Sequence, residues 1–202
     1  MSTKLLFGVV LTLALAPLSA YADDGNPPPN GLKEKTVALA ENTIDHARRI
    51  LDEGDNILYL SGYSYHDRGT YTAEKIAGFN EQAWGAGFGR TLIDDHGNSN
   101  SLFALAFLDS HSDVEAQVGY VREWRWQFAE HAAVGAGFVA MLVSRSDMFN
   151  NFPFPAILPV ASVEVKRVTL MAIGIPKLSS SEDGNGNNGN VLFLLGRINL
   201  GR

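Results

Sequence analysis

The sequence predicts an all-β protein, an eight-stranded antiparallel transmembrane β-barrel preceded by one N-terminal amphipathic α-helix. Three observations lead to this fold class. Apolar segments of about ten residues recur eight times after residue 55, the connections between them alternate in length, and no second helical period of comparable quality is present. An even strand number is typical of bacterial single-chain barrels, and a tilted strand of ~9–11 residues crosses a bilayer.

The first 22 residues have the features of a secretory signal peptide. Lys4 precedes the apolar run LLFGVVLTLALA, and the small-residue pattern Ala20-Tyr21-Ala22 follows it. We therefore expect cleavage after Ala22 and export of the mature chain, which fits a protein of the cell outer membrane. Residues 23–31, DDGNPPPNG, form a polar, proline-rich spacer.

An amphipathic helix is expected over residues 32–54. Its apolar residues recur at intervals of three and four, whereas charged residues occupy the other side. The apolar stripe consists of Val37, Ala40, Ile44, Ala47 and Leu51. Gly54 stands where a helix stop belongs. On pattern alone, the helix either packs on a protein core or lies in a membrane interface beside a barrel.

Residues 55–202 supply the barrel. The expected strands are Ile57–His66, Phe79–Leu92, Leu102–Leu108, Val114–Trp124, Ala132–Ser144, Ala156–Val165, Val168–Ile175 and Val191–Leu200. Long connections follow the first, fifth and seventh strands, whereas the turn DDHGN and the joint near Lys166 are short. Long outer loops and short periplasmic turns are typical of outer-membrane barrels.

Composition narrows the function classes. A formal net charge of −6 offers no basic surface for nucleic acid. The absence of cysteine excludes a disulfide framework and a thiolate zinc site. After the signal peptide, no stretch approaches ~18 uninterrupted apolar residues, so a membrane-spanning helix is not expected.

Three chemically capable side chains begin two odd-to-even connections. His66 ends the first expected strand, and Asp109 and Ser110 follow the third. In an up-and-down barrel, all odd-to-even connections lie at the same end, so these three side chains are expected at one rim. The competing interpretation is that His66 is a solvated loop histidine and that Asp-Ser is an ordinary turn opener.

The barrel interior is expected to be apolar near this rim and polar further away. Leu102–Leu108 and Val191–Leu195 are apolar on both faces. The polar inward positions are Glu115, Gln117, Glu123, Arg197 and Asn199. A closed eight-stranded barrel holds either packed side chains or one slender ligand, so the apolar half is either a solid core or a well for an acyl chain.

Four stretches resemble the PagP lipid A palmitoyltransferase family in order and spacing. They are FNEQAWGAGFG (79–89), LFALAFLDS (102–110), FPAILPVASV (154–163) and NNGNVLF (187–193). The interval from His66 to Trp84 also matches the family's distance between its catalytic histidine and a tryptophan. The resemblance covers roughly residues 35 to 200.

This resemblance implies an outer-membrane enzyme that moves a palmitoyl or shorter acyl chain from a glycerophospholipid to lipid A of lipopolysaccharide. The family's catalytic residues correspond to His66, Asp109 and Ser110, and neither a metal nor another cofactor is implied. The implied partners are the two lipids and the outer-membrane bilayer, with no nucleic acid. One chain supplies the whole rim, so a monomer is expected.

Acyl transfer between hydroxyl groups suits these residue types. A histidine can take a proton from the attacking hydroxyl and return it to the departing one, while a carboxylate fixes the tautomer of the ring. Ser110 either carries the acyl group as a nucleophile or positions an ester while lipid A attacks directly.

Lipid access depends on the barrel wall. Proline removes a backbone donor and weakens a strand seam, and Pro159 and Pro176 match the prolines of the family's lateral gate. A second gate in the family also has prolines, but this chain has Ser61 and Ala83 at the corresponding positions. We therefore expect one gate near Pro159 and Pro176.

Two further positions follow from the alignment with the family. Val121 stands at the floor of the acyl well, where palmitate-selective members have glycine. A bulkier floor favours a donor chain shorter than palmitate, because each buried methylene contributes ~0.8 kcal/mol. Arg145 aligns loosely with an arginine of the third outer loop.

Two other functions are compatible with the strand pattern. One is a non-catalytic small outer-membrane barrel with a structural, adhesive or lipid-binding role. The other is a secreted lipid-binding barrel, whose outer face is polar. The apolar outward positions of the last strand argue against the secreted barrel. These positions are Leu192, Leu194, Gly196, Ile198 and Leu200.

Overall fold

A computed structural model describes residues 30–146, 151–177 and 189–202. The chain divides into two units, residues 1–53 and 54–202, which are described separately here. The expected signal peptide and most of the expected spacer lie outside the described residues.

Helix α2 (Asn30–Glu53) begins two residues before the expected start and ends just before Gly54. From Glu41 to Glu53 its acidic and arginine side chains are exposed. Two ion pairs at helical spacing join four of them: Arg48 with Asp45 at 3.0 Å, and Arg49 with Glu53 at 3.4 Å. In the described part of the chain, no helix combines the length and apolar character needed to cross a membrane.

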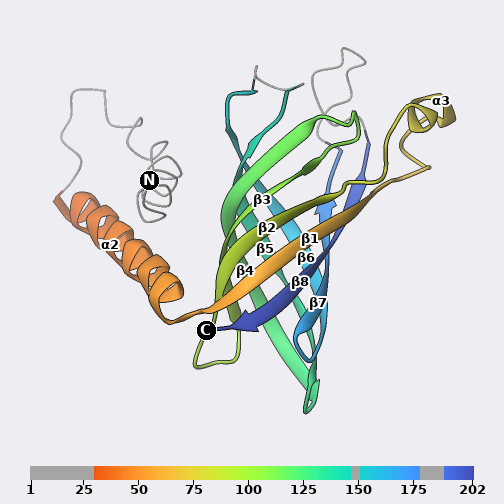
Figure 1. Cartoon of the computed structure of the whole chain (residues 1–202). Coiled ribbons are helices and arrows are strands. Elements are labelled where there is room, and N and C mark those ends of the chain that lie inside the picture. Colours follow the sequence, from red (N-terminus) through yellow and green to blue (C-terminus); the bar gives the residue numbers. More distant parts are fainter. Residues whose placement is uncertain (1–29, 147–150, 178–188) are drawn as a thin grey trace. The chain divides into compact units, whose positions relative to one another are not determined.

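The second unit is a closed antiparallel barrel in which each strand pairs with its neighbours in sequence and the last strand pairs with the first. This confirms the predicted fold class, and Figure 1 shows the tilted strands around the closed wall. The strands are β1 (Asp55–His66), β2 (Gly85–Ile93), β3 (Ser99–Leu108), β4 (Val114–Ala129), β5 (Ala132–Ser144), β6 (Phe154–Val165), β7 (Val168–Ile175) and β8 (Val191–Gly201).

The two ends of the barrel carry different connections. We call one end the loop rim; its connections are residues 67–84, 109–113, 145–153 and 176–190. We call the other the turn end; its connections are residues 94–98, 130–131 and 166–167. Lys166 adopts a positive φ of 55° in the last of these tight turns. The alternation of long and short connections therefore follows the predicted arrangement.

The expected start of the second strand at Phe79 is wrong. β2 begins at Gly85, where an added Cβ would come within 2.2 Å of the carbonyl oxygen of Ala106, so glycine permits the close approach of β3. Residues 67–84 form a rim loop that includes the unexpected short helix α3 (Ala73–Ala77). Thr72 caps this helix by accepting a hydrogen bond from the Lys75 N–H.

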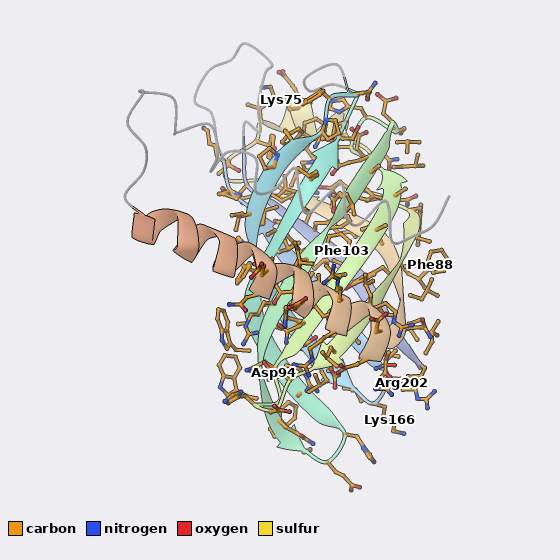
Figure 2. The ribbon with its side chains drawn as sticks, turned by 90° about the vertical axis from the view of Figure 1, so that its left-hand side faces the viewer. Lys75, Phe88, Asp94, Phe103, Lys166 and Arg202 are labelled. Carbon is orange, nitrogen blue, oxygen red and sulfur yellow. The ribbon has the colours of Figure 1, made fainter. Side chains whose placement is uncertain are left out.

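Side chains alternate between the two faces of the wall, as a strand period of two requires. Figure 2 shows Phe88 pointing away from the wall, and this side chain is 71% exposed, whereas Phe103 is 4% exposed inside the barrel. Other large apolar side chains are also exposed on the outer face, including Leu60, Ile157, Leu170, Leu192 and Leu200. The outer face of the barrel is therefore predominantly apolar.

Apolar side chains fill most of the interior of the rim half. Its buried cluster includes Ile57, Phe103, Leu105, Phe107, Phe193 and Leu195. The rings of Phe107 and Phe193 stack with centroids 4.7 Å apart, although β3 and β8 are not neighbours in the sheet. Aromatic side chains therefore cross the lumen at this level.

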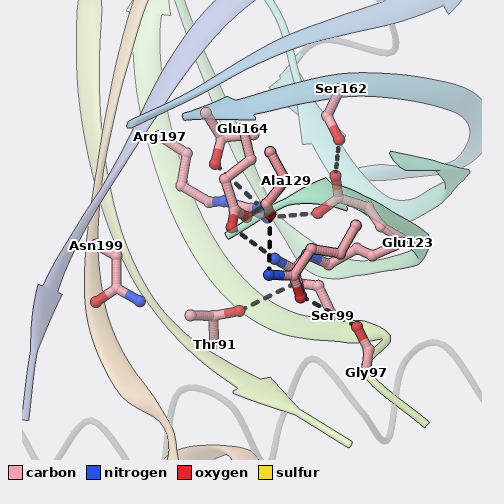
Figure 3. Close-up of polar contacts among 12 residues, drawn as sticks. Thr91, Gly97, Ser99, Glu123, Ala129, Ser162, Glu164, Arg197 and Asn199 are labelled. Atoms are coloured by element: carbon pink, nitrogen blue, oxygen red, sulfur yellow. Dashed lines mark hydrogen bonds and ion pairs between the residues drawn. The ribbon is translucent and has the colours of Figure 1, made fainter. Parts of the chain in front are cut away.

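Polar side chains fill the interior toward the turn end. Figure 3 shows Arg197 and Ser162 directed at the buried Glu123 carboxylate, and both donate hydrogen bonds to it. The prediction that Glu115 and Gln117 share this polar region is wrong. β4 descends from the loop rim, so its first inward side chains lie near that rim, where Gln117 donates a 2.7 Å hydrogen bond to Glu115.

Candidate active site

The barrel brings the three predicted side chains to the same end. His66 is the last residue of β1, while Asp109 and Ser110 begin the connection after β3. Both connections belong to the loop rim because successive strands run in opposite directions. His66 and Asp109 are each only 3% exposed, so neither is a solvated loop side chain.

Aromatic rings fix the position of the His66 imidazole. The Phe79 ring lies at a tilted angle against it, with centroids 4.5 Å apart, and the Tyr71 ring meets it edge-on at 5.3 Å. Phe79 also meets the ring of His111 edge-on at 5.8 Å. The rim loop therefore packs between the histidine of β1 and the connection that follows β3.

Glu81 is the carboxylate that contacts His66. Its Oε1 accepts a 3.0 Å hydrogen bond from the His66 backbone N–H and lies 3.3 Å from the imidazole Nδ1. The Arg68 guanidinium donates hydrogen bonds to both Glu81 oxygens, and the Tyr63 hydroxyl donates a third at 2.7 Å. The Arg68 hydrogen bonds hold the pKa of Glu81 well below its usual range, so this carboxylate is ionised at neutral pH.

The Asp109 carboxylate has different partners. Its Oδ1 accepts hydrogen bonds from the backbone N–H groups of His111 at 2.8 Å and Asp113 at 3.0 Å, which closes the turn after β3. Its Oδ2 lies 3.4 Å from an Arg145 nitrogen, and a second nitrogen of Arg145 lies 3.4 Å from Glu115. Arg145 therefore links two acidic side chains at the rim.

Ser110 connects to the same rim loop through its backbone. Its carbonyl oxygen accepts a 2.8 Å hydrogen bond from the Asn80 N–H, and the Asn80 side chain donates to the Ser112 hydroxyl at 3.1 Å. The consecutive residues Phe79, Asn80 and Glu81 thus reach both His66 and the Ser110 turn.

The sequence does not point to Glu81 as a functional residue. The stretch Phe79–Leu92 is predicted as a strand, and an acidic residue in a strand gives no sign of a contact with a distant histidine. Among the described residues, no hydrogen bond joins the Asp109 carboxylate to His66, so the expected carboxylate partner of the ring differs from the observed one. The one sequence feature that could have indicated this contact is the acidic residue within FNEQAW, a stretch that resembles the family.

Two seams of the wall are incomplete near the loop rim. Pairing between β6 and β7 ends at Val160 and Ile173, so Pro159 and Gly174 lie in the first unpaired positions. A Cβ on Gly174 would be 3.5 Å from Pro159 Cγ, which places these two residues side by side. Pairing between β1 and β2 ends at Ser61 and Gly85. Pro176 directly follows β7.

Val121 marks the change from apolar to polar interior. It is 3% exposed within the apolar cluster, and its ladder partners are Ser101 and Val139. The next inward residue of β4 is Glu123, which is fully buried and belongs to the polar region. A chain that enters the lumen from the loop rim would meet Val121 at the lower limit of the apolar half.

The apolar outer face, the closed wall and the buried histidine at the rim define a small β-barrel of the bacterial outer-membrane class. A family model described as "Antimicrobial peptide resistance and lipid A acylation protein PagP" matches residues 46–197. The match covers more than half of the chain and confirms the resemblance noted in the sequence. The chain belongs to the PagP family.

Individual relatives agree with this assignment. A Bordetella bronchiseptica protein named Lipid A acyltransferase PagP is 40% identical over 185 residues, which cover 92% of each chain. A Legionella pneumophila protein of the same name is 43% identical over 148 residues, which cover 73% of this chain and 76% of the relative.

Proposed function

We propose that this chain is an outer-membrane acyltransferase that moves a fatty acyl chain from a glycerophospholipid to lipid A. The observation that carries the proposal is the family match over residues 46–197, together with relatives named lipid A acyltransferase. The apolar outer face of the barrel supports insertion in a bilayer, because lipid-facing positions of such barrels are apolar. One barrel carries all the proposed groups, so the chain acts as a monomer.

His66 is the proposed general base. Its Nε2 takes the proton from the attacking hydroxyl as that oxygen bonds to the ester carbonyl carbon, and the same proton is returned to the oxygen of the departing lysophospholipid. Such proton transfer contributes ~10²–10⁴-fold to a rate. Asp109 organises the turn that presents Ser110, and Arg145 holds the Asp109 carboxylate at the rim.

Ser110 has two roles consistent with its position. As a nucleophile, its hydroxyl attacks the donor ester, forms an acyl-enzyme and releases the lysophospholipid; a lipid A hydroxyl then attacks the acyl-enzyme and frees Ser110. As a positioning residue, it orients the donor ester while the lipid A hydroxyl attacks directly. Accumulation of an acylated Ser110 in the absence of lipid A would support the first role, and its absence the second.

We propose that lipids enter laterally between β6 and β7, on the loop-rim side of the pair formed by Val160 and Ile173. A proline at position 159 supplies no N–H to this seam, and Pro176 ends β7. The acyl chain then lies in the apolar rim half, where it displaces the stacked rings of Phe107 and Phe193. Val121 forms the floor, so a donor chain shorter than palmitate is preferred.

The test uses the purified, folded chain in detergent micelles with a defined phospholipid and lipid A. Mass spectrometry is expected to detect lipid A that has gained one acyl chain, together with an equal amount of lysophospholipid. A folded chain that binds both lipids and forms neither product would support the non-catalytic barrel instead.

A further inference from the structure

We propose that Glu81 is a positioning residue that holds the His66 imidazole with its proton on Nδ1 and leaves Nε2 free to act as the base. This inference rests on the proposed base role of His66. The resemblance to the PagP family gives no reason to expect this orienting role in a residue of the rim loop.

The geometry of the contact supports this assignment. One Glu81 oxygen, Oε1, accepts from the His66 backbone N–H at 3.0 Å and lies 3.3 Å from Nδ1 of the same residue. The two contacts fix both the main chain and the ring of His66 relative to one atom. An ionised carboxylate only accepts hydrogen bonds, so the ring nitrogen that faces it must carry the proton.

The surrounding charges keep Glu81 in the ionised state. Arg68 donates to both of its oxygens, at 2.8 Å on the Oε2 side, and Tyr63 donates at 2.7 Å to the same Oε2. A carboxylate with these donors is a charge-assisted acceptor. Oε1 is the oxygen turned to His66, so the imidazole faces a fixed negative group.

Two further features favour Glu81 over Asp109 in this role. Asp109 uses its oxygens for the backbone N–H groups of its own turn and for Arg145. The rings of Phe79 and Tyr71 also restrict rotation of the imidazole, so the contact with Glu81 is kept in one ring orientation. Phe79 lies two positions before Glu81, and the same loop therefore supplies both restraints.

The experiment compares Glu81→Ala with a matched control, Gln82→Ala. Gln82 is an exposed neighbour in the same loop. Each variant is folded in micelles, with barrel formation checked by its heat-dependent migration on gels. ¹⁵N spectra of histidine-labelled protein at pH 8 report which ring nitrogen carries the proton, and the spectrum of His66→Ala identifies the His66 signals. Initial rates over a range of donor concentrations give kcat and KM.

We expect Glu81→Ala to lower kcat by about tenfold or more with KM nearly unchanged. Without Glu81, a larger fraction of His66 carries its proton on Nε2 and is unable to act as the base. The His66 signals should shift from the Nδ1–H form toward the Nε2–H form. Gln82→Ala should retain the wild-type spectrum and rate. Where Glu81→Ala does not fold, Glu81→Gln preserves the shape of the side chain, and an intermediate kcat with a mixed tautomer population is expected.

Wild-type tautomer signals together with wild-type kcat in folded Glu81→Ala or Glu81→Gln would overturn the inference. In that case, an inactive His66→Ala would leave the proposed function in place. A fully active His66→Ala would overturn the base role itself and, with it, the catalytic consequence of the Glu81 contact.

Discussion

The backbone N–H of Asn80 donates a 2.8 Å hydrogen bond to the carbonyl oxygen of Ser110. This bond ties the loop after β1 to the turn after β3, while the neighbouring Phe79 and Glu81 contact His66. The histidine and the serine are therefore positioned by one short segment rather than by two independent loops. Changes in that segment are expected to affect both side chains together.

Closing the seam between β6 and β7 should block the proposed lipid access route. The chain has no cysteine, so a Pro159→Cys/Gly174→Cys pair can be oxidised without competing thiols. Pro159 and Gly174 are adjacent across the unpaired seam, which suits a disulfide. Oxidation should remove most of the acyltransferase activity, and reduction should restore it, as measured by lysophospholipid release.

The matched control for this cross-link is Val163→Cys/Leu170→Cys. These two residues pair within the intact part of the same seam, where the wall is already closed. Oxidation of the control pair should leave activity unchanged. Wild-type activity in both the oxidised and the reduced Pro159→Cys/Gly174→Cys variant would show that lipids reach the lumen by another path.

Shortening the side chain at the interior floor should change the acyl-chain preference. Val121→Gly extends the apolar half, and each additional buried methylene of the donor contributes ~0.8 kcal/mol, or roughly a fourfold preference. We expect the variant to favour longer donors than the wild type when a mixture of phospholipids is supplied. Mass spectrometry of the acylated lipid A measures the distribution.

The control for the floor is Val118→Gly, which removes the same side chain from the outer face of β4. It should leave the distribution of transferred chains unchanged. If both glycine variants and the wild type transfer acyl chains of the same length, the Val121 side chain does not set the maximum length of the transferred chain.

The ion pair between Glu81 and Arg68 should stabilise the barrel in a pH-dependent way. The pKa of Glu81 in the folded protein lies below its ordinary value. The stabilisation by this ion pair is therefore complete above pH ~4.3 and is lost as the pH falls toward the folded-state pKa of Glu81. Arg68 is nearly half exposed, so Glu81→Gln should reduce the unfolding free energy at pH 7 by only about 1 kcal/mol.

Guanidinium unfolding in detergent at pH 7 and at lower pH values measures this difference. The gap between the wild type and Glu81→Gln should narrow once the pH drops below about 4. A gap that stays constant down to pH 3 would mean that the Glu81 charge does not contribute to stability.

The buried pair of Glu123 and Arg197 should dominate the stability of the turn-end interior. Their side chains are 1% and 5% exposed, and removing Glu123 leaves the buried Arg197 with the more distant Glu164 carboxylate, 4.0 Å away. Glu123→Gln should therefore lower the unfolding free energy by about 3–5 kcal/mol. Ser162→Ala removes only one hydrogen bond to Glu123 and should cost about 1 kcal/mol. Similar losses in both variants would contradict the role assigned to the ion pair.

The strand pattern was sufficient to predict the barrel, its outward apolar face and the common rim of His66, Asp109 and Ser110. These features depend on alternation along each strand and on the order of connections, both of which are local in sequence. The path of residues 67–84 was not predictable in the same way, because contacts with His66 and Ser110 decide it. The expected position of Glu115 is wrong although the strand order determines it: β4 starts at the loop rim, so its second residue lies near that rim.

His66 and Ser110 are proposed to form the acyl-transfer site at the loop rim. The most direct measurement is mass spectrometry of lipid A from cells that lack their own acyltransferase and express the wild type, His66→Ala or Ser110→Ala at equal levels of folded barrel. We expect an additional acyl chain on lipid A with the wild type only. Equal lipid A acylation by folded wild type and His66→Ala would contradict it.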